Sequence, residues 1–316
     1  KIIFIFTFFV TIDSFYQFFN YDPEFGFLND ILGRKPEGTY GRISGPFKDL
    51  VPGSVVSKFF FICLLCIFLN YLNFFKNKLF NIFISILILS LMITIVYCSG
   101  ERIALATLFL GIIITLITFK SIRKILIFSM ILSLIFIILI NIFHPIYNDF
   151  KIIKSSSRHE GLIIEKEFKC KNSKNELCRK EILLQPKFLA VLKDFKGSAY
   201  GEIYNTAYNI WKDNKLFGIG LNNFKSVCNS NNKYDKYHNF YSCGIHPHNF
   251  YIQALVESGI IGLLLFISFL FLIFKTIFIS NQKKEFKIIF IISLIIIFWP
   301  IMSTGSFLKN WHMALI

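Results

Sequence analysis

The chain has 316 residues, of which 54% are hydrophobic and 40 are phenylalanine. A soluble domain of this length cannot bury so much apolar surface, so the composition excludes an ordinary soluble globular protein and indicates a membrane protein. The net charge of +15 could suit a nucleic-acid-binding protein, but the basic residues lie in short connections rather than on one continuous face, which argues against that class.

The apolar segments divide into one short run and six longer ones. Residues 1–12 form a run that is shorter than the roughly 20 residues that a membrane-spanning helix needs. Because the chain also starts with Lys1 rather than Met, we expect a fragment that lacks upstream helices, which leaves the presence of a signal sequence open. The longer runs predict membrane-spanning helices at residues 54–72, 79–98, 103–119, 125–143, 250–275 and 288–307.

The connections between these helices carry basic clusters that fall on one side of the membrane when the spans alternate. The clusters are Lys76 and Lys78; Lys120, Arg123 and Lys124; and Lys283, Lys284 and Lys287. Basic residues concentrate in cytoplasmic loops, so this side is predicted to be cytoplasmic. The outer side then receives a short loop at 13–52, the turn at 98–102 and a large loop at 144–247.

These assignments predict an all-α polytopic membrane protein, a helix bundle with a large, partly helical periplasmic loop. We expect three regions: membrane helices at 1–143 that include the short loop, the large loop at 144–247, and two C-terminal membrane helices at 248–316. Within the large loop, residues 199–213 carry apolar and aromatic side chains at helical spacing, which predicts a helix there.

The seven cysteines divide by location. Those in apolar spans, Cys63, Cys66 and Cys98, are typical of small buried hydrophobes. The other four lie in the large outer loop, where an oxidising compartment favours one or two disulfides: Cys170, Cys178, Cys228 and Cys243. A zinc site from these four is less favoured, because none of them shows C-x-x-C spacing.

Two outer-side segments contain an arginine that could bind an anion. Arg102 lies in Ser99-Gly100-Glu101-Arg102 between two spans, and Arg42 lies in Arg42-Ile43-Ser44-Gly45-Pro46-Phe47 before the span at 54–72. A guanidinium group fits a diphosphate because its donors match two phosphate oxygens. The alternatives are that Arg102 snorkels and pairs with Glu101, and that the Arg42 segment is a simple turn.

The strongest local pattern is His246-Pro247-His248-Asn249, which enters the span at 250–275 and is followed by Gly259 and Gly262. The partial positive charge of a helix N-terminus disfavours a protonated imidazole, so His248 is suitably placed to act as a general base. The two glycines would let another helix come close. The alternative interpretation is that His248 only caps the helix.

No motif for a metal or nucleotide accompanies these residues. The sequence has no D-x-D pair, no H-E-x-x-H and no G-x-x-x-x-G-K-[ST]. It therefore implies no cofactor and no metal site.

Taken together, these segments resemble the O-antigen ligase family, which includes lipopolysaccharide O-antigen ligases and related O-antigen polymerases. The family's histidine motif, H-[N/S/Q] followed by nine residues and G-x-x-G, is similar to His248, Asn249, Gly259 and Gly262. Its arginine motif resembles residues 99–104. The segments at 42–47, 211–224 and 303–307 are also similar, so the resemblance extends from about residue 40 to the end.

The resemblance implies a GT-C-like glycosyltransferase of the bacterial inner membrane, multi-pass, with an active site that faces the periplasm. It implies an undecaprenyl-diphosphate-linked glycan as donor and lipid A-core or another glycan as acceptor. In this role His248 deprotonates the acceptor, supported by His246 and Asn249, and Arg102 and Arg42 stabilise the departing diphosphate.

Three alternatives remain open at this point. A polymerase differs from a ligase only in using a second lipid-linked glycan as acceptor. A transporter for the same lipid would need charges deep in several spans. A docking protein would use the large loop to bind a cell-wall partner.

Overall fold

The computed structural model describes residues 2–37, 41–47, 50–69, 77–148, 151–158, 161–169, 177–184, 193–230, 233–234 and 243–300. These residues divide into two compact units. Unit 1 comprises Lys1–Ser155, Ile164–Ile182 and Asn281–Ile297, and unit 2 comprises Ser156–Ile163, Leu183–Ser280 and Phe298–Ile316.

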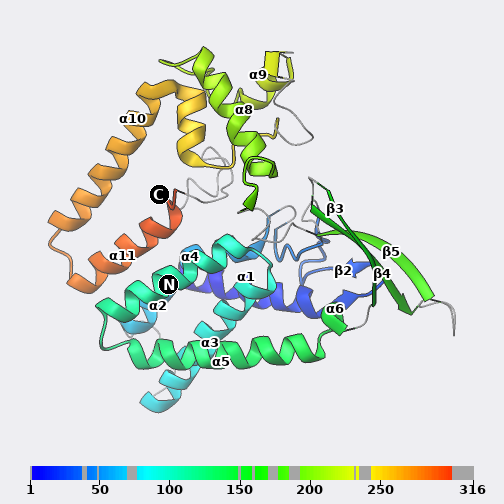
Figure 1. Cartoon of the computed structure of the whole chain (residues 1–316). Coiled ribbons are helices and arrows are strands. Elements are labelled where there is room, and N and C mark those ends of the chain that lie inside the picture. The colour runs from blue at the N-terminus through cyan, green and yellow to red at the C-terminus, as the bar shows by residue number, and fades with distance from the viewer. Residues whose placement is uncertain are drawn as a thin grey trace. The chain divides into compact units, whose positions relative to one another are not determined.

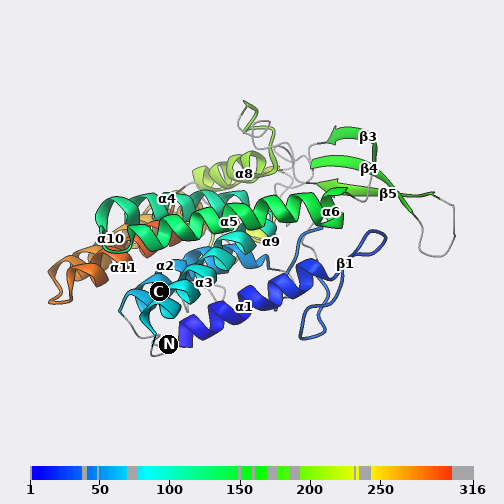
Figure 2. The same cartoon turned by 90° about the horizontal axis from the view of Figure 1, so that it is seen from below.

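Unit 1 contains the apolar helices of the first half of the chain. They are α1 (Ile2–Phe19), α2 (Pro52–Phe68), α3 (Lys78–Cys98), α4 (Arg102–Thr118) and α5 (Arg123–Phe143), followed by the short α6 (Pro145–Asn148) and, late in the chain, α11 (Lys284–Ile297). Figure 2 shows α1, α3 and α5 running along one another. Helix α2 packs against α1, α3, α4 and α11, and its side chains Phe60, Phe61 and Leu64 are fully buried in the core.

Four helices of the described chain are long and apolar enough to cross a membrane: Ile2–Phe19, Lys78–Cys98, Arg123–Phe143 and Phe250–Ile279. Shorter apolar helices are Pro52–Phe68 and Arg102–Thr118. The predicted all-α polytopic membrane fold is therefore confirmed. Residues 301–307, part of the last predicted span, lie outside the described residues, as does the similar segment at 303–307.

The expectation for the first apolar run was wrong. Helix α1 continues to Phe19, so it is long enough to span, and the loop that follows it begins at Asn20 rather than at residue 13. The pattern was misleading because Asp13, Ser14 and Gln17 are polar but fully buried. These side chains face the protein rather than the lipid, so they do not interrupt the helix.

The segments between the helices contain short strands that the sequence analysis did not predict. Strands β1 (Tyr21–Asp22) and β2 (Gly26–Phe27) form an antiparallel hairpin in which Tyr21 pairs with Phe27. Strands β3 (Lys151–Arg158), β4 (Gly161–Lys169) and β5 (Leu177–Leu184) form a three-stranded sheet in that order (Figure 1).

Unit 2 is built on the predicted helix of the large loop. Helix α8 (Ala199–Asp213) has the predicted bounds, and Ser198 caps it by accepting a hydrogen bond from the Gly201 amide. It packs against α9 (Phe224–Ser230) and α10 (Phe250–Ile279). The core between the three helices contains Ile203, Ala207, Ile210, Phe224, Cys228 and Val256.

Candidate functional site

Arg42 and Arg102 lie close to one another in unit 1, although 60 residues separate them in the chain. Arg102 is the first residue of α4 and is exposed, and Arg42 is near enough to interact with it electrostatically. Gly100 explains the approach: it has φ +71°, and a Cβ added there would lie 3.3 Å from Arg42 Cδ. The structure thus brings together the two arginines that the sequence singled out.

Glu101 pairs differently from the alternative considered in the sequence. It interacts with Arg42 and Lys58 and accepts hydrogen bonds from the backbone and hydroxyl of Ser54 on α2. Burial raises the pKa of Glu101 to about 6, against the opposing effect of the two cations. Its Oε2 atom is buried without a hydrogen-bond partner among the described residues. Arg102 is therefore not the principal partner of this carboxylate.

Sequence reasoning missed Lys58. It lies in the second turn of α2, is 1% exposed, and interacts electrostatically with Glu101. The available signal was a lysine inside a predicted span, because an ionisable residue at such a place is itself a sign of a functional site. Arg42, Lys58 and Arg102 thus bring three cations to the neighbourhood of Glu101, and such a group of positive charges suits an anion.

Polar residues of α1 hold the segment that carries Arg42. Gln17 Oε1 accepts hydrogen bonds from the Ser44 amide at 2.7 Å and the Gly45 amide at 2.8 Å. Its Nε2 donates to the Arg34 carbonyl at 3.2 Å. All these groups are buried or half-buried, so leaving the two amides unsatisfied would be costly. A buried glutamine in the first helix therefore fixes the loop two residues after Arg42.

In unit 2, Asn249 joins three segments at the start of α10. Its Oδ1 caps the helix by accepting from the amides of Tyr251 at 2.9 Å and Ile252 at 3.1 Å. Its Nδ2 donates to the Pro300 carbonyl at 2.7 Å, and its side chain also hydrogen-bonds Tyr204 of α8. The interpretation of His248 as the helix cap is wrong, because Asn249 fills that position.

His248 lies immediately before this cap in an uncommon backbone conformation. Its φ is +56°, a left-handed value that a residue with a Cβ adopts at a cost of about 1–3 kcal/mol. Its ring is half-buried, 4.2 Å from the ring of buried His246 and 5.9 Å from the ring of Tyr200, measured between centroids. An imidazole that is held by two rings and still reached by solvent can take a proton from a bound hydroxyl.

Tyr204 is an alternative base at this junction, since its side chain hydrogen-bonds Asn249. Burial raises the pKa of Tyr204 to about 12. Its hydroxyl therefore remains protonated near neutral pH and cannot take a proton from an acceptor. Within the described part of this junction, His248 fits the role of base better.

Gly259 and Gly262 do not admit another helix. Gly259 has φ +68° and ψ −168° and divides α10 into two parts, which Figure 1 shows pointing in different directions. A Cβ on Gly259 would clash with the backbone of Leu216, and one on Gly262 would clash with Ser258 of the same helix. The close neighbour of the kink is thus the loop after α8.

A polar pair that the sequence analysis did not identify lies just before this kink. Gln253 Nε2 donates to Glu257 Oε2 at 3.1 Å, and both side chains are buried. The backbone of Asn222 also hydrogen-bonds Glu257, which connects the helix to the loop before α9. The available signal was Glu257, because it is an ionisable residue inside the predicted span at 250–275.

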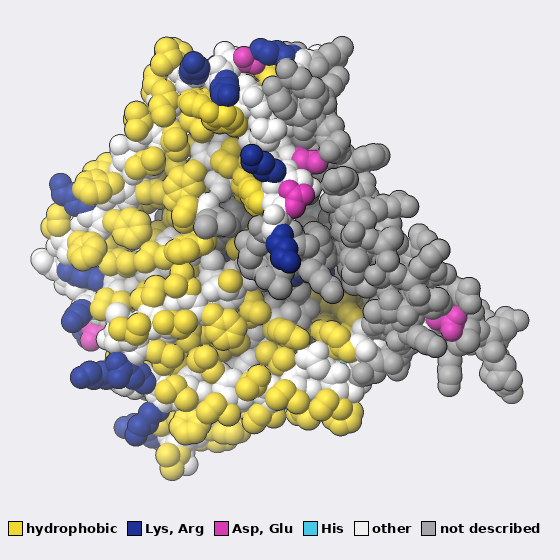
Figure 3. Space-filling view, viewed as in Figure 1, with side chains coloured by type: hydrophobic (Ala, Val, Ile, Leu, Met, Phe, Trp, Pro, Cys, Tyr) yellow, Lys and Arg dark blue, Asp and Glu magenta, His cyan; other side chains and the backbone are white. Residues whose placement is uncertain are grey.

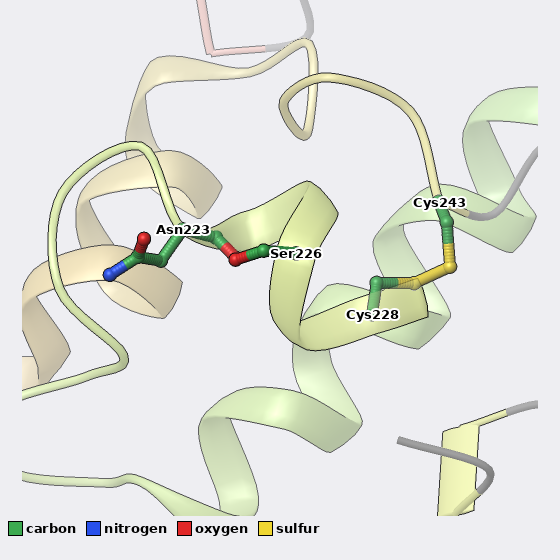
Figure 4. Close-up of a disulfide and its surroundings, with 4 residues drawn as sticks. All are labelled: Asn223, Ser226, Cys228 and Cys243. Atoms are coloured by element: carbon green, nitrogen blue, oxygen red, sulfur yellow. A yellow bond between two sulfur atoms is a disulfide. The ribbon is translucent and has the colours of Figure 1, made fainter. Parts of the chain in front are cut away.

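Two of the four outer-loop cysteines form a disulfide in the structure. Cys228 of α9 is joined to Cys243, whose Cα lies 5.5 Å away (Figure 4). This bond restrains the chain five residues before His248. Cys178 is also disulfide-bonded, and Cys170 lies outside the described residues. Cys63, Cys66 and Cys98 are free.

Among the residues that the structure describes, no group of three or more histidine, cysteine, aspartate or glutamate side chains could hold a metal ion. Comparison with protein families gives one finding: the family model described as O-antigen ligase matches residues 87–267, more than half of the chain. The match includes Arg102, His248 and both glycines of the kink, and it begins after Arg42 and Lys58. No curated protein matches the chain.

Proposed function

Because the chain belongs to the O-antigen ligase family, we propose that it is a membrane glycosyltransferase that moves a glycan from undecaprenyl diphosphate to an acceptor hydroxyl. The observation that carries this proposal is the convergence of Arg42, Lys58 and Arg102 around Glu101. Such a group of cations binds the diphosphate of a lipid-linked donor and stabilises the charge that develops on it as the sugar leaves.

The proposed reaction needs one base and one anion site. His248 takes the proton of the acceptor hydroxyl, whose oxygen attacks the anomeric carbon of the donor sugar. The bond from that carbon to the diphosphate oxygen breaks, and the electron pair leaves with the diphosphate, which Arg42, Lys58 and Arg102 stabilise. Attack opposite the leaving group inverts the anomeric centre. The cations supply the charge stabilisation that a divalent metal supplies elsewhere.

The first test is replacement of the proposed base. We expect His248→Ala to abolish glycan transfer while the purified protein still binds the lipid-linked donor, because the anion site is made by other residues. Tyr200→Phe is the matched control, since it keeps the ring beside His248 and removes only the hydroxyl. The measurement is transfer by full chain in nanodiscs, with lipid A-core and a second lipid-linked glycan offered separately as acceptors.

The same assay tests the anion site. Arg102→Ala should lower the transfer rate by about 10² to 10³, the usual effect of removing one charged donor from a transition state. Arg102→Lys should recover part of the rate, because it restores the charge without the paired donors. Normal transfer by both His248→Ala and Arg102→Ala would refute the roles assigned to these residues. Absence of transfer by the unchanged protein with either acceptor would favour a transport or docking role.

A further inference from the structure

The loop after α8 is tied to α10 on both sides of the kink. The Ile260 amide, which loses its helical partner at Gly259, donates to the Lys215 carbonyl at 2.9 Å. In the other direction, the amides of Ile219 and Gly220 donate to the carbonyls of Val256 at 3.1 Å and Glu257 at 2.9 Å. The backbone of residues 215–220 is therefore fixed at one level of α10.

That level is the outer end of a membrane span. The part of α10 after the kink, residues 260–279, reaches about 30 Å at about 1.5 Å per residue, the thickness of the hydrocarbon layer. Its large apolar side chains are exposed, among them Leu264 (57%) and Leu265 (66%). Figure 3 shows hydrophobic side chains along this helix. The loop at 215–217 thus lies where the hydrocarbon ends and the headgroups begin.

The side chains of this loop are of the types that proteins place at the boundary between hydrocarbon and headgroups. Leu216 is 59% exposed and Phe217 is 74% exposed. Half-buried Trp211 at the end of α8 and exposed Lys212 and Lys215 precede them. Aromatic side chains and snorkelling lysines are enriched at membrane interfaces.

The local charge favours anionic lipid. Asp213 is the only carboxylate in residues 211–221, and it forms an ion pair with Lys233 at 2.7 Å and accepts a hydrogen bond from the Tyr234 hydroxyl at 2.8 Å. Its charge is therefore balanced by a residue from outside the loop. Lys212 and Lys215 give the segment a net positive charge toward phosphate headgroups.

We propose that residues 211–221 form an interfacial anchor that lies in the headgroup layer of an anionic phospholipid bilayer, at the outer end of α10. The anchor inserts Leu216 and Phe217 among the upper acyl chains and places Lys212 and Lys215 on the phosphates. Through α8 and the kink it holds the junction that carries His248 at a constant depth.

The test measures depth in the full chain, reconstituted into phospholipid vesicles, with one tryptophan as probe. Phe217→Trp is introduced in a background in which Trp211, Trp299 and Trp311 are replaced by phenylalanine. We expect strong loss of fluorescence with lipids brominated near the headgroup, less with lipids brominated near the chain ends, and little with iodide in water. Leu264→Trp in the same background is the reference, and deep bromines should quench it most.

A second variant controls for misfolding of the first. With Trp299→Phe and Trp311→Phe alone, Trp211 reports on the same segment while Leu216 and Phe217 remain. Quenching of Phe217→Trp by iodide but not by brominated lipid would place the loop in water and overturn the proposal. Insensitivity to both quenchers would show that protein covers the loop, which would overturn it equally.

The charge is tested by comparing vesicles with and without phosphatidylglycerol. We expect bromolipid quenching of Phe217→Trp to increase with the anionic lipid, and Lys212→Gln with Lys215→Gln to remove that increase. Equal quenching in both vesicles before these changes would contradict the preference for anionic lipid. Since no measurement uses glycan transfer, the result is independent of the proposed enzymatic function.

Discussion

At the scale of single residues, the chemistry depends on how charge is balanced at the anion site. Glu101 is a carboxylate that interacts with both Arg42 and Lys58. In its ionised form it competes with a diphosphate for the same cations. Protonation removes that competition, so the state of Glu101 decides how strongly an added anion is held.

This predicts a pH dependence of anion binding. The pKa of Glu101 is raised to about 6 by burial, so the carboxylate is ionised above that pH and neutral below it. We expect the affinity for pyrophosphate, measured by calorimetry on the purified protein, to increase as pH falls through about 6. Glu101→Gln should bind as the low-pH protein does across this window, which corrects for the titration of pyrophosphate itself.

The control is Glu202→Gln, which neutralises a buried carboxylate in unit 2. It should leave the pH profile unchanged. A profile that Glu101→Gln does not alter would mean that another group controls anion binding.

At the scale of elements, two contacts, one in each unit, fix the segments that carry candidate site residues. The first is the passage of the loop 215–220 over the kink, where Gly218 and Gly259 face one another. A Cβ on Gly218 would lie 2.5 Å from the Glu257 carbonyl carbon. The second is the contact of Gln17 with the loop that carries Arg42.

Gly259→Ala should destabilise unit 2 strongly. The mutation adds a clash with the Leu216 carbonyl to a backbone conformation that is essentially restricted to glycine. Gly26→Ala is the matched control, because Gly26 has φ +82° but nothing within 4 Å of an added Cβ. We expect Gly259→Ala to lose about 2 kcal/mol or more beyond the control, measured by thermal unfolding in detergent. Equal shifts would show that the loop does not pack as described.

Gln17→Leu should weaken binding of the lipid-linked donor while leaving His248, the proposed base, in place. It leaves the amides of Ser44 and Gly45 unsatisfied, so the segment with Arg42 loses its fixed position. We expect the KM for the lipid-linked donor to rise about tenfold, equivalent to about 1.4 kcal/mol of binding, with a smaller change in kcat. The measurement is steady-state transfer in nanodiscs.

Thr11→Val on the same helix is the control for Gln17→Leu. Thr11 is also fully buried, and its hydroxyl donates to the Thr7 carbonyl within the helix. Its replacement should leave KM unchanged. If Thr11→Val raised KM as much as Gln17→Leu, the effect would belong to packing of α1 rather than to the Arg42 loop.

At the scale of the whole molecule, the proposal requires both halves of the site to face the same side of the membrane. The basic clusters of the connections predict that residues 120–124 and 283–287 are cytoplasmic and that residues 144–247 are outside.

Reporter fusions test this topology. Alkaline phosphatase fused after Asn148 should be active, because the enzyme matures only outside the cytoplasm, whereas fusions after Ser121 and Gln282 should be inactive. Immunoblots control for the amount of each fusion. Active fusions after Gln282 would invert the second half of the chain and separate His248 from the arginines.

The sequence by itself determined the membrane class, the positions of most helices and the motif that carries His248. These follow from local properties: apolar run length, helical spacing in residues 199–213, and a histidine and asparagine before a helix. It also indicated Arg42 and Arg102, because an arginine beside a span is costly without an anionic partner.

Only the tertiary structure decided what these residues contact. Lys58 and Gln17 are polar residues in apolar helices, and their roles depend on partners distant in the chain: Glu101 lies against Lys58, and the Ser44 amide, 27 residues away, donates to Gln17. The role of Gly259 also depends on a distant segment, because the backbone that packs against it is the loop at Leu216. The spacing of apolar residues in the sequence shows which side of a helix is buried. Which polar groups then contact one another depends on how segments distant in the sequence pack together.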